Sequence, residues 1–258
     1  MLKKILPFTF ALVITLGVSG GASLGAILAM TFGITIPGLP FAGTMIMAML
    51  FAFLSLIIIL SLAYRLDFSL STNTIILLGV IYSMFTASIN ALLVSFAGER
   101  VKDITFWLMG SLSGSSYMNV LALAVCALVC CGIILCCARE LNAFAIGEDN
   151  ARHVGGNVRR VKMTVLISVA ALIGVCVSVS GTIGFVGLVT PHMVRMIVGP
   201  NHKRLLPATL FGGASFLMLA DLVARTLLSP RELPIGVITS LIGAVLFLAI
   251  FFRMRKGR

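Results

Sequence analysis

Long apolar runs dominate the chain and are separated by short polar segments. A run of about 20 apolar residues is long enough to cross a bilayer as an α-helix. The runs predict about eight helical elements, with approximate bounds 8–33, 42–64, 73–96, 117–138, 163–186, 190–199, 205–228 and 235–252. The element at 190–199 is too short to cross alone. Because apolar and polar positions do not alternate, the strands of a membrane barrel are excluded.

The composition points in the same direction. Hydrophobic residues make up 60% of the chain and charged residues 10%, against about 45–50% and about 25% in soluble proteins. The spans recur from end to end, which predicts an all-α integral membrane protein with one transmembrane domain over residues 1–258. Lys3 and Lys4 before an apolar run are also compatible with a signal peptide. The run continues to Ile36 without a polar cleavage region, which favours an uncleaved first span.

Lysine and arginine residues are distributed unevenly between the two sides of the predicted bundle. If Lys3 and Lys4 are inside, the same side also receives Arg65, Arg139, Arg152, Arg159, Arg160, Lys162, Lys203, Arg204, Arg253, Arg255, Lys256 and Arg258. The other side receives Arg100, Lys102, Arg225 and Arg231, and Arg195 is undecided. This bias predicts that both termini are cytoplasmic in a plasma (inner) membrane. It also accounts for the net charge of +11 without nucleic acid as a partner.

The sequence predicts no catalytic, metal or cofactor site in this chain. A Gly-rich loop followed by Lys-Ser or Lys-Thr is absent, so ATP and magnesium would bind to a partner subunit. The histidines are scattered. The cysteines lie within apolar spans, where small hydrophobic side chains help helices to pack; they are Cys126, Cys130, Cys131, Cys136, Cys137 and Cys176.

Asp221 and Arg225 are among the few ionisable residues inside a predicted span. Four residues apart, they share one helix face and can neutralise each other near the outer end of the span. Two interpretations remain open. The residues form an internal ion pair without further function, or Arg225 reaches the external surface and receives an acidic partner.

The longest polar segment, residues 139–162, reads RELNAFAIGEDNARHVGGNVRRVK. It is long enough for two short helices that are broken at Gly147, the second of which would begin near Glu148 and Asp149 and end at Gly155. It is either an ordinary basic connector or a docking surface for a cytoplasmic protein.

Several motifs resemble the permease family of iron-siderophore, haem and cobalamin ABC importers, of the FecCD or BtuC type. The most specific is SGTIGFVGLVTPHMVR from Ser180, followed by LLPATLFGGAS, LADLVAR and ELPIGVITSLIGAVLF. Upstream, LGVSGGASLGA, STNTIILLGV, WLMGS and AIGEDNARHVGG stand in the order of the family. The resemblance therefore spans almost the whole chain.

The resemblance implies a bundle like that of a type II ABC importer. It implies a homodimer, or a pair with a homologous permease, two cytoplasmic ATPase subunits, an external substrate-binding protein and the surrounding lipid bilayer. By resemblance, the residues that couple to the ATPase are Ala145, Ile146, Gly147, Glu148, Asp149, Ala151, Arg152 and Gly155. Ser71, Thr72 and Asn73 resemble the cytoplasmic gate.

By the same resemblance, Arg225 receives the external binding protein, and Asp221 is assigned to structure or to the substrate path. Glu232, Pro234 and Gly236 resemble the turn into the last helix, where proline fits a first helical turn. The remaining residues assigned to structure or path are Gly181, Gly184, Gly187, Pro191 and His192. The three glycines recur every three residues. Close helix packing is the first interpretation of this spacing, and lining of the substrate path is the second.

The chain departs from the family at its beginning. The family has two further helices there, with an R-x-P-R motif and an asparagine-proline-leucine-alanine motif, and Met1 to Thr15 contain neither. The sequence therefore predicts a permease that imports an iron-siderophore, or a haem- or cobalamin-like chelate. The alternative is a truncated, transport-inactive fragment or a membrane scaffold.

Overall fold

The computed structural model describes residues 2–36, 42–66, 72–113, 115–144, 158–229 and 231–256. These residues form ten α-helices and one short 3₁₀ turn, which confirms the all-α prediction. The helices fall into two compact units, residues 1–105 with 115–181 and residues 106–114 with 182–258. The single-domain assignment stays a prediction.

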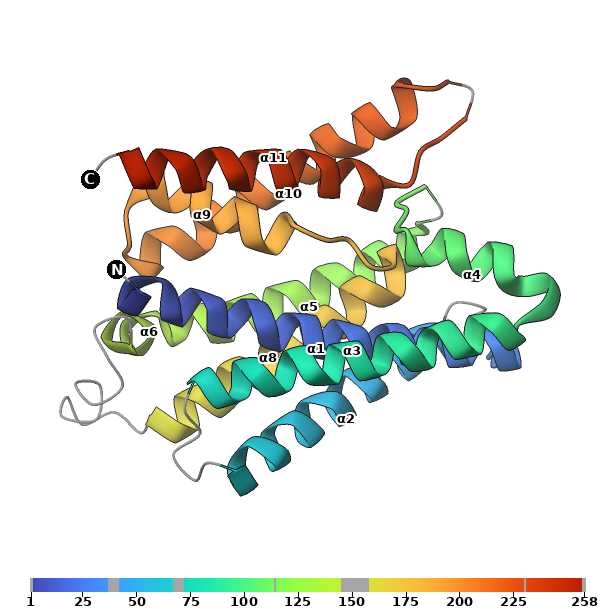
Figure 1. The fold of residues 1–258 in the computed structure, drawn as a ribbon, viewed down its shortest axis with the longest axis horizontal. Helices are drawn as coiled ribbons and strands as arrows, with labels where there is room; N and C mark the ends of the chain where they lie inside the picture. Colours follow the sequence, from blue (N-terminus) through green and yellow to red (C-terminus); the bar gives the residue numbers. More distant parts are fainter. Residues whose placement is uncertain are drawn as a thin grey trace. The chain divides into compact units, whose positions relative to one another are not determined.

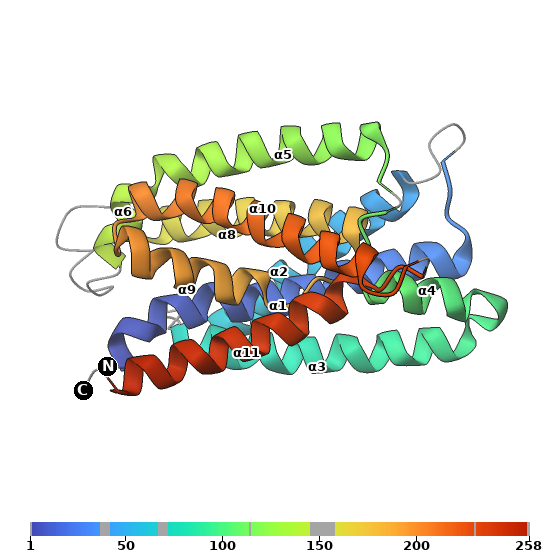
Figure 2. The ribbon, with the colours of Figure 1, turned by 90° about the horizontal axis from the view of Figure 1, so that it is seen from above.

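The first unit is a bundle of long apolar helices. α1 contacts α2, α3 and α8, while α8 also contacts α2 and α5, and these neighbours can be followed in Figures 1 and 2. The bounds are Leu2–Phe32 for α1, Ala42–Leu66 for α2, Thr72–Phe96 for α3, Tyr117–Cys136 for α5, Ala138–Phe144 for α6 and Val158–Ser180 for α8.

The second unit contains three helices that contact one another: α9 (Val186–Val198), α10 (His202–Thr226) and α11 (Ile235–Lys256). A short segment joins the two units through the chain. It consists of the 3₁₀ turn η1 (Gly98–Arg100) and the eight-residue helix α4 (Val101–Leu108). The first five residues of α4 belong to the first unit and the remainder to the second.

Five of the described helices are long and apolar enough to cross a membrane. They are Ala42–Leu66, Thr74–Phe96, Tyr117–Cys136, Arg160–Ser180 and His202–Thr226. Shorter apolar stretches occur at Gly17–Phe32, Val186–Val198 and Ile235–Ala249. The chain is therefore a multi-pass membrane protein, as its composition predicts.

Glycines on α1 allow its neighbours to approach the backbone closely. On the side of α2, a Cβ at Gly25 would overlap the carbonyl of Met47, and a Cβ at Gly21 would lie 2.9 Å from the carbonyl oxygen of Phe51. On the side of α3, a Cβ at Gly20 would lie 2.5 Å from Oγ1 of Thr86. Small residues at helix contacts are how membrane helices gain packing energy in the absence of a hydrophobic driving force.

Interhelical hydrogen bonds accompany this packing. Nδ2 of the buried Asn90 on α3 donates to Oγ of Ser23 on α1 at 2.9 Å. Ser55 on α2 and Tyr82 on α3 lie 2.9 Å apart through their hydroxyl oxygens. Such bonds fix the rotation of each helix about its axis, because the polar groups have no water partner in the bilayer core.

Several predicted boundaries differ from the structure, most clearly those on either side of residues 181–185. The helix expected over 163–186 ends at Ser180, and the short element expected at 190–199 begins at Val186. The reason lies in the connecting backbone, where Gly181 and Phe185 both have positive φ, 68° and 66°. A right-handed helix cannot continue through such residues. The sequence analysis also missed α4, because its eight residues include Lys102 and Asp103 and form no apolar run.

Candidate functional site

The C-terminal end of α10 carries the ion pair that the sequence predicts. At the other end of this helix, Oδ1 of Asn201 accepts from the backbone N–H of Lys203 at 3.1 Å, which caps the first turn. Near the last turn, Nε of Arg225 donates to Oδ2 of Asp221 at 2.8 Å. The acid precedes the base by four residues, which is the favourable order on a helix.

Arg225 is both oriented and accessible. Its side chain is 43% exposed and that of Asp221 26%. The positive charge lies beside the carbonyl end of the helix dipole, which stabilises it. Asp221 contacts one edge of the guanidinium through Nε, so the terminal nitrogens can reach a second partner. The pair is too exposed to stabilise the fold by much, since surface ion pairs contribute about 0–1 kcal/mol.

The turn after α10 is fixed by backbone hydrogen bonds. The N–H of Leu233 donates to the carbonyl of Ala224 at 3.0 Å, which folds the chain back onto the last turn of α10. Pro234, expected in the first helical turn, directly precedes Ile235, the first residue of α11, and has no N–H to satisfy there. Glu232 lies in this turn and is exposed, next to the exposed Arg231.

The segment after α4 caps the first turn of α11. The N–H of Ile235 donates to the carbonyl of Gly110 and the N–H of Gly236 to the carbonyl of Met109, both at 3.1 Å. The first N–H groups of a helix have no partner within it, so these two carbonyls satisfy donors that would otherwise be unpaired. Oγ1 of Thr182 donates to the carbonyl of Leu108 at 2.6 Å and holds the same segment.

Gly236 is required by the closeness of this contact. A Cβ at this position would overlap the carbonyl oxygen of Met109 and lie 3.3 Å from the carbonyl oxygen of Thr182. Two backbone segments therefore meet the first turn of α11 where no side chain fits. The sequence places Gly236 in the turn into the last helix, and the structure shows which backbone atoms it accommodates.

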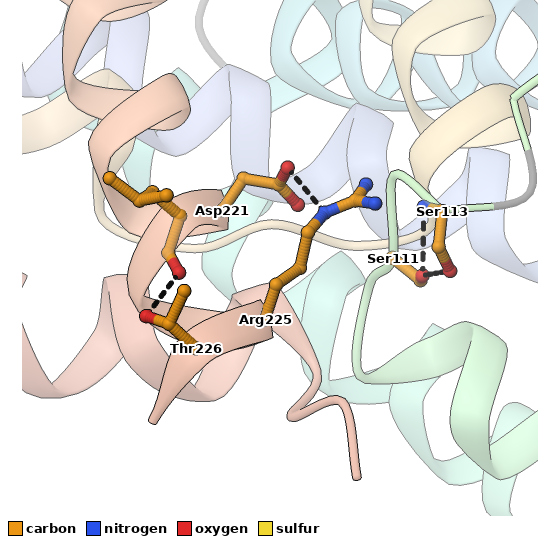
Figure 3. A network of polar contacts seen from close by, with 6 residues as sticks. Ser111, Ser113, Asp221, Arg225 and Thr226 are labelled. Carbon is orange, nitrogen blue, oxygen red and sulfur yellow. Dashed lines mark hydrogen bonds and ion pairs between the residues drawn. The ribbon is translucent and has the colours of Figure 1, made fainter. Parts of the chain in front are cut away.

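An apolar cluster lies beneath the ion pair. Its buried members are Ala220, Ala224, Ile235 and Ile238, and the half-buried residues packed against them include Leu112, Leu217, Val223 and Leu233. Because Leu112 belongs to this cluster, the turn around it lies beside the last turns of α10. Figure 3 shows this turn, with Ser111 and Ser113 bonded at 2.8 Å, next to the Arg225 side chain. The site is thus a well-packed helix end that carries a partly exposed positive charge on Arg225.

The coupling residues lie outside the described part of the chain. Ala145, Ile146, Gly147, Glu148, Asp149, Ala151, Arg152 and Gly155 all fall within 145–157. The described helices on either side are α6 and α8. Of the gate residues, Ser71 is also outside, while Thr72 and Asn73 are the first two residues of α3. The roles of all these residues stay predictions.

The glycines of the SGTIGFVG motif occupy different environments. Gly181 has φ +68° and ends α8, with its N–H donated to the carbonyl of Val177 at 2.8 Å. A Cβ at Gly184 would touch only Oγ of Ser240, at 3.5 Å, and a Cβ at Gly187 would meet no described atom within 4 Å. Close packing is therefore not seen at Gly187. Pro191 and His192 both lie within α9.

Phe185 is a residue that the sequence analysis missed. It has φ +66° and ψ −26°, and the N–H of Val186 donates across it to the carbonyl of Gly184 at 2.8 Å, forming a γ-turn at the start of α9. A bulky residue is rarely held in this conformation. Its side chain packs on Gly243 of α11, where a Cβ would overlap the Cβ of Phe185. No sequence signal marks a phenylalanine for this conformation.

Comparisons with known proteins agree with an all-helical, multi-pass membrane protein. A family model described as the FecCD transport family matches residues 9–253. An uncharacterized ABC transporter permease protein, YvrB of Bacillus subtilis (strain 168), is 39% identical over 243 residues, which are 94% of this chain and 69% of that protein. The hemin transport system permease protein HmuU of Yersinia pestis is 37% identical over 248 residues, 94% of this chain and 73% of that protein.

A solved structure shares the fold. It is an inward-facing conformation of an ABC transporter that has been assigned to the metal-chelate type, with a TM-score of 0.84 and 31% sequence identity. The match covers 97% of this chain and 84% of that chain.

Proposed function

The chain belongs to the FecCD transport family of ABC importer permeases, and we propose that it moves an iron-siderophore, or another metal chelate such as haem or cobalamin, into the cytoplasm. The observation that carries this proposal is the agreement of sequence and fold over nearly the whole chain with a metal-chelate type transporter. The membrane-spanning helices provide the conduit, and ATP with magnesium would be bound and hydrolysed by a partner subunit.

The proposed assembly follows from this role. Two copies of the chain, or one copy and a homologous permease, would enclose a path within the lipid bilayer, with two cytoplasmic ATPase subunits on one side and a substrate-binding protein on the other. The lysine and arginine bias supports a topology with both termini in the cytoplasm and Arg225 outside.

Arg225 would receive an acidic side chain of the external binding protein. The support is geometric, since the residue is 43% exposed and Asp221 holds its Nε at 2.8 Å. A guanidinium fixed at one edge keeps terminal donors for a bidentate contact with a carboxylate. Asp221 would thereby hold Arg225 in one rotamer and lower the ordering entropy lost when the partner binds.

On the cytoplasmic side, the segment from Ala145 to Gly155 would couple to the ATPase, with Gly147 and Glu148 as the principal residues. Ser71, Thr72 and Asn73 would form the gate at the start of α3. Both assignments rest on the resemblance of the motifs.

Reconstitution tests the proposal directly. The chain would be placed in liposomes with a partner ATPase and a substrate-binding protein, and uptake of a labelled ferric siderophore, haem or cobalamin would be measured with ATP inside. Uptake of one chelate, with ATPase stimulation by the loaded binding protein, is expected. Binding of a chelate to the external protein without uptake of that chelate would contradict the transport role.

Charge reversal tests the docking site. Arg225→Glu should abolish stimulation, because it places a carboxylate opposite the acidic partner and next to Asp221. Arg231→Ala removes an exposed cation from the turn that follows and serves as the matched control. Equal stimulation of wild type and Arg225→Glu would exclude Arg225 as a docking residue.

A further inference from the structure

Two serines lie beside Arg225 in the turn that follows α4. Ser111 and Ser113 are both exposed, and their hydroxyl oxygens are 2.8 Å apart. The backbone N–H of Ser113 also donates to Oγ of Ser111 at 3.3 Å. These two contacts fix the positions of the hydroxyl groups relative to each other. Figure 3 shows the pair next to the Arg225 side chain.

The serine pair keeps one hydroxyl hydrogen for an acceptor from outside. Two hydroxyl groups carry two hydrogens, and the hydrogen bond between Ser111 and Ser113 uses one of them. The backbone contact uses only an acceptor position on Ser111. Whichever serine donates to the other, the second hydrogen is used by neither contact, so the pair can act as a donor.

Packing and backbone hydrogen bonds hold the turn against the end of α10. Leu112, between the two serines, is half-buried against the cluster that includes Ala224, the residue before Arg225. Just upstream, the carbonyl of Gly110 accepts from the N–H of Ile235 at 3.1 Å. All these residues belong to the second unit, so the position of the serines beside Arg225 does not depend on the first unit.

The charges at this end of the second unit add up to zero. Residues 106–114 contain no charged side chain, and residues 217–234 contain two acids, Asp221 and Glu232, and two bases, Arg225 and Arg231. A neutral set of charges attracts an acidic partner only weakly from a distance. Recognition of a carboxylate here therefore depends on directional donors at contact distance.

We propose that Ser111 and Ser113 form, together with Arg225, one recognition site for a carboxylate side chain of the external substrate-binding protein. The terminal nitrogens of Arg225 donate to the two carboxylate oxygens, and the remaining hydroxyl hydrogen of the serine pair donates to a further lone pair of the same group. This inference rests on the proposed docking role of Arg225 and adds the residues that complete the contact.

Binding of a carboxylate to the full chain in lipid nanodiscs tests the proposal without a partner protein. The probe is a short peptide with blocked ends and a single glutamate, and the nitrogen NMR signals of the Arg225 side chain report its binding. The double variant Ser111→Ala/Ser113→Ala should bind the peptide about tenfold more weakly, because a hydrogen bond to a charged group is lost. Each single variant should lose less, since the remaining serine keeps its hydrogen.

Thr226→Val is the matched control. Thr226 follows Arg225, and its Oγ1 donates to the carbonyl of Leu222 at 2.7 Å, so its hydroxyl hydrogen is already used within α10. The affinity for the peptide should therefore stay unchanged. An equal loss in Thr226→Val, or an unchanged affinity in the double serine variant, would overturn the proposal.

A coupling measurement distinguishes a direct contact from damage to the turn. Arg225→Lys keeps the charge but loses the bidentate contact that orients the carboxylate toward the serines. If Arg225 and the serines bind the same carboxylate, the double serine substitution should cost less than tenfold in the Arg225→Lys background. The same loss in both backgrounds would show that the serines do not share the ligand of Arg225, and the proposal would fail.

The reconstituted transporter provides the functional measurement. In the double serine variant, half-maximal ATPase stimulation should need about tenfold more loaded binding protein, with maximal stimulation and basal activity unchanged. A lower maximum at an unchanged half-maximal concentration would assign the serines to a later step and contradict the proposal. If the wild type shows no stimulation, the proposed function fails, and the peptide measurement still decides whether these residues recognise a carboxylate.

Discussion

Gly236→Ala probes the contact between the segment after α4 and the first turn of α11. The added Cβ would overlap the carbonyl of Met109, so the helix end must move away. The movement lengthens two hydrogen bonds, Gly236 to Met109 and Ile235 to Gly110, both 3.1 Å in the native structure. Each bond contributes about 0.5–1.5 kcal/mol, and overpacking adds about 1–3 kcal/mol.

The gain in helix propensity opposes this loss of stability and is smaller. Alanine is favoured over glycine in a helix interior by about 1 kcal/mol. The net expectation for Gly236→Ala is therefore a loss of about 1–5 kcal/mol in the free energy of unfolding. Gly187→Ala is the matched control, because a Cβ at this helical position meets no described atom within 4 Å. That variant should be neutral or slightly more stable.

The chain offers a local probe for this measurement. Its single tryptophan, Trp107, lies two residues before Met109 in α4. Tryptophan fluorescence during denaturant unfolding in detergent micelles therefore reports on the segment that Gly236→Ala disturbs. Equal transition midpoints for Gly236→Ala and Gly187→Ala would show that the close backbone approach does not exist in solution.

Three further experiments test other contacts. Asn90→Ala and Ser23→Ala should each reduce stability, and a double-mutant cycle by thermal unfolding should give a coupling of about 0.6 kcal/mol, the average for membrane hydrogen bonds; additive losses would refute the bond. Gly25→Val places a branched side chain against the carbonyl of Met47 and should separate α1 from α2. The measurement is disulfide trapping between cysteines introduced on the two helices, which the variant should lose. Phe185→Gly should exceed Phe185→Ala in stability by about 1 kcal/mol, because only glycine adopts φ +66° without strain; the reverse order in thermal unfolding would contradict the γ-turn.

The long helices could be predicted from the sequence because each one is an apolar run bounded by glycine, proline or charge. The expected 42–64 and 73–96 became Ala42–Leu66 and Thr72–Phe96. The break between Ser180 and Val186 could not be placed, because it depends on positive φ at Phe185, and that conformation depends on packing against Gly243. Local propensity carries no information about such a contact.

In the candidate site, too, local contacts could be predicted from the sequence and long-range contacts could not. The spacing of Asp221 and Arg225 was enough to predict a pair on one helix face, and the structure confirms the contact at 2.8 Å. The hydrogen bond of the Arg100 side chain to the carbonyl of Met30 on α1 was beyond prediction, because it joins residues 70 positions apart through one flexible side chain. Arg100 entered the sequence analysis only as a cation on the outer side.

The shortness of α9 has a consequence for how the protein enters the membrane. With 13 residues, the helix extends about 20 Å, whereas the hydrocarbon core is about 30 Å thick. It cannot be released into lipid from the translocon as a separate span. Gly199 at φ +82° lies in the short connection to α10, which contacts α9. The two helices would therefore partition into the bilayer together as one hairpin. α9 would remain at the protein-lined exit of the translocon until α10 has been synthesised.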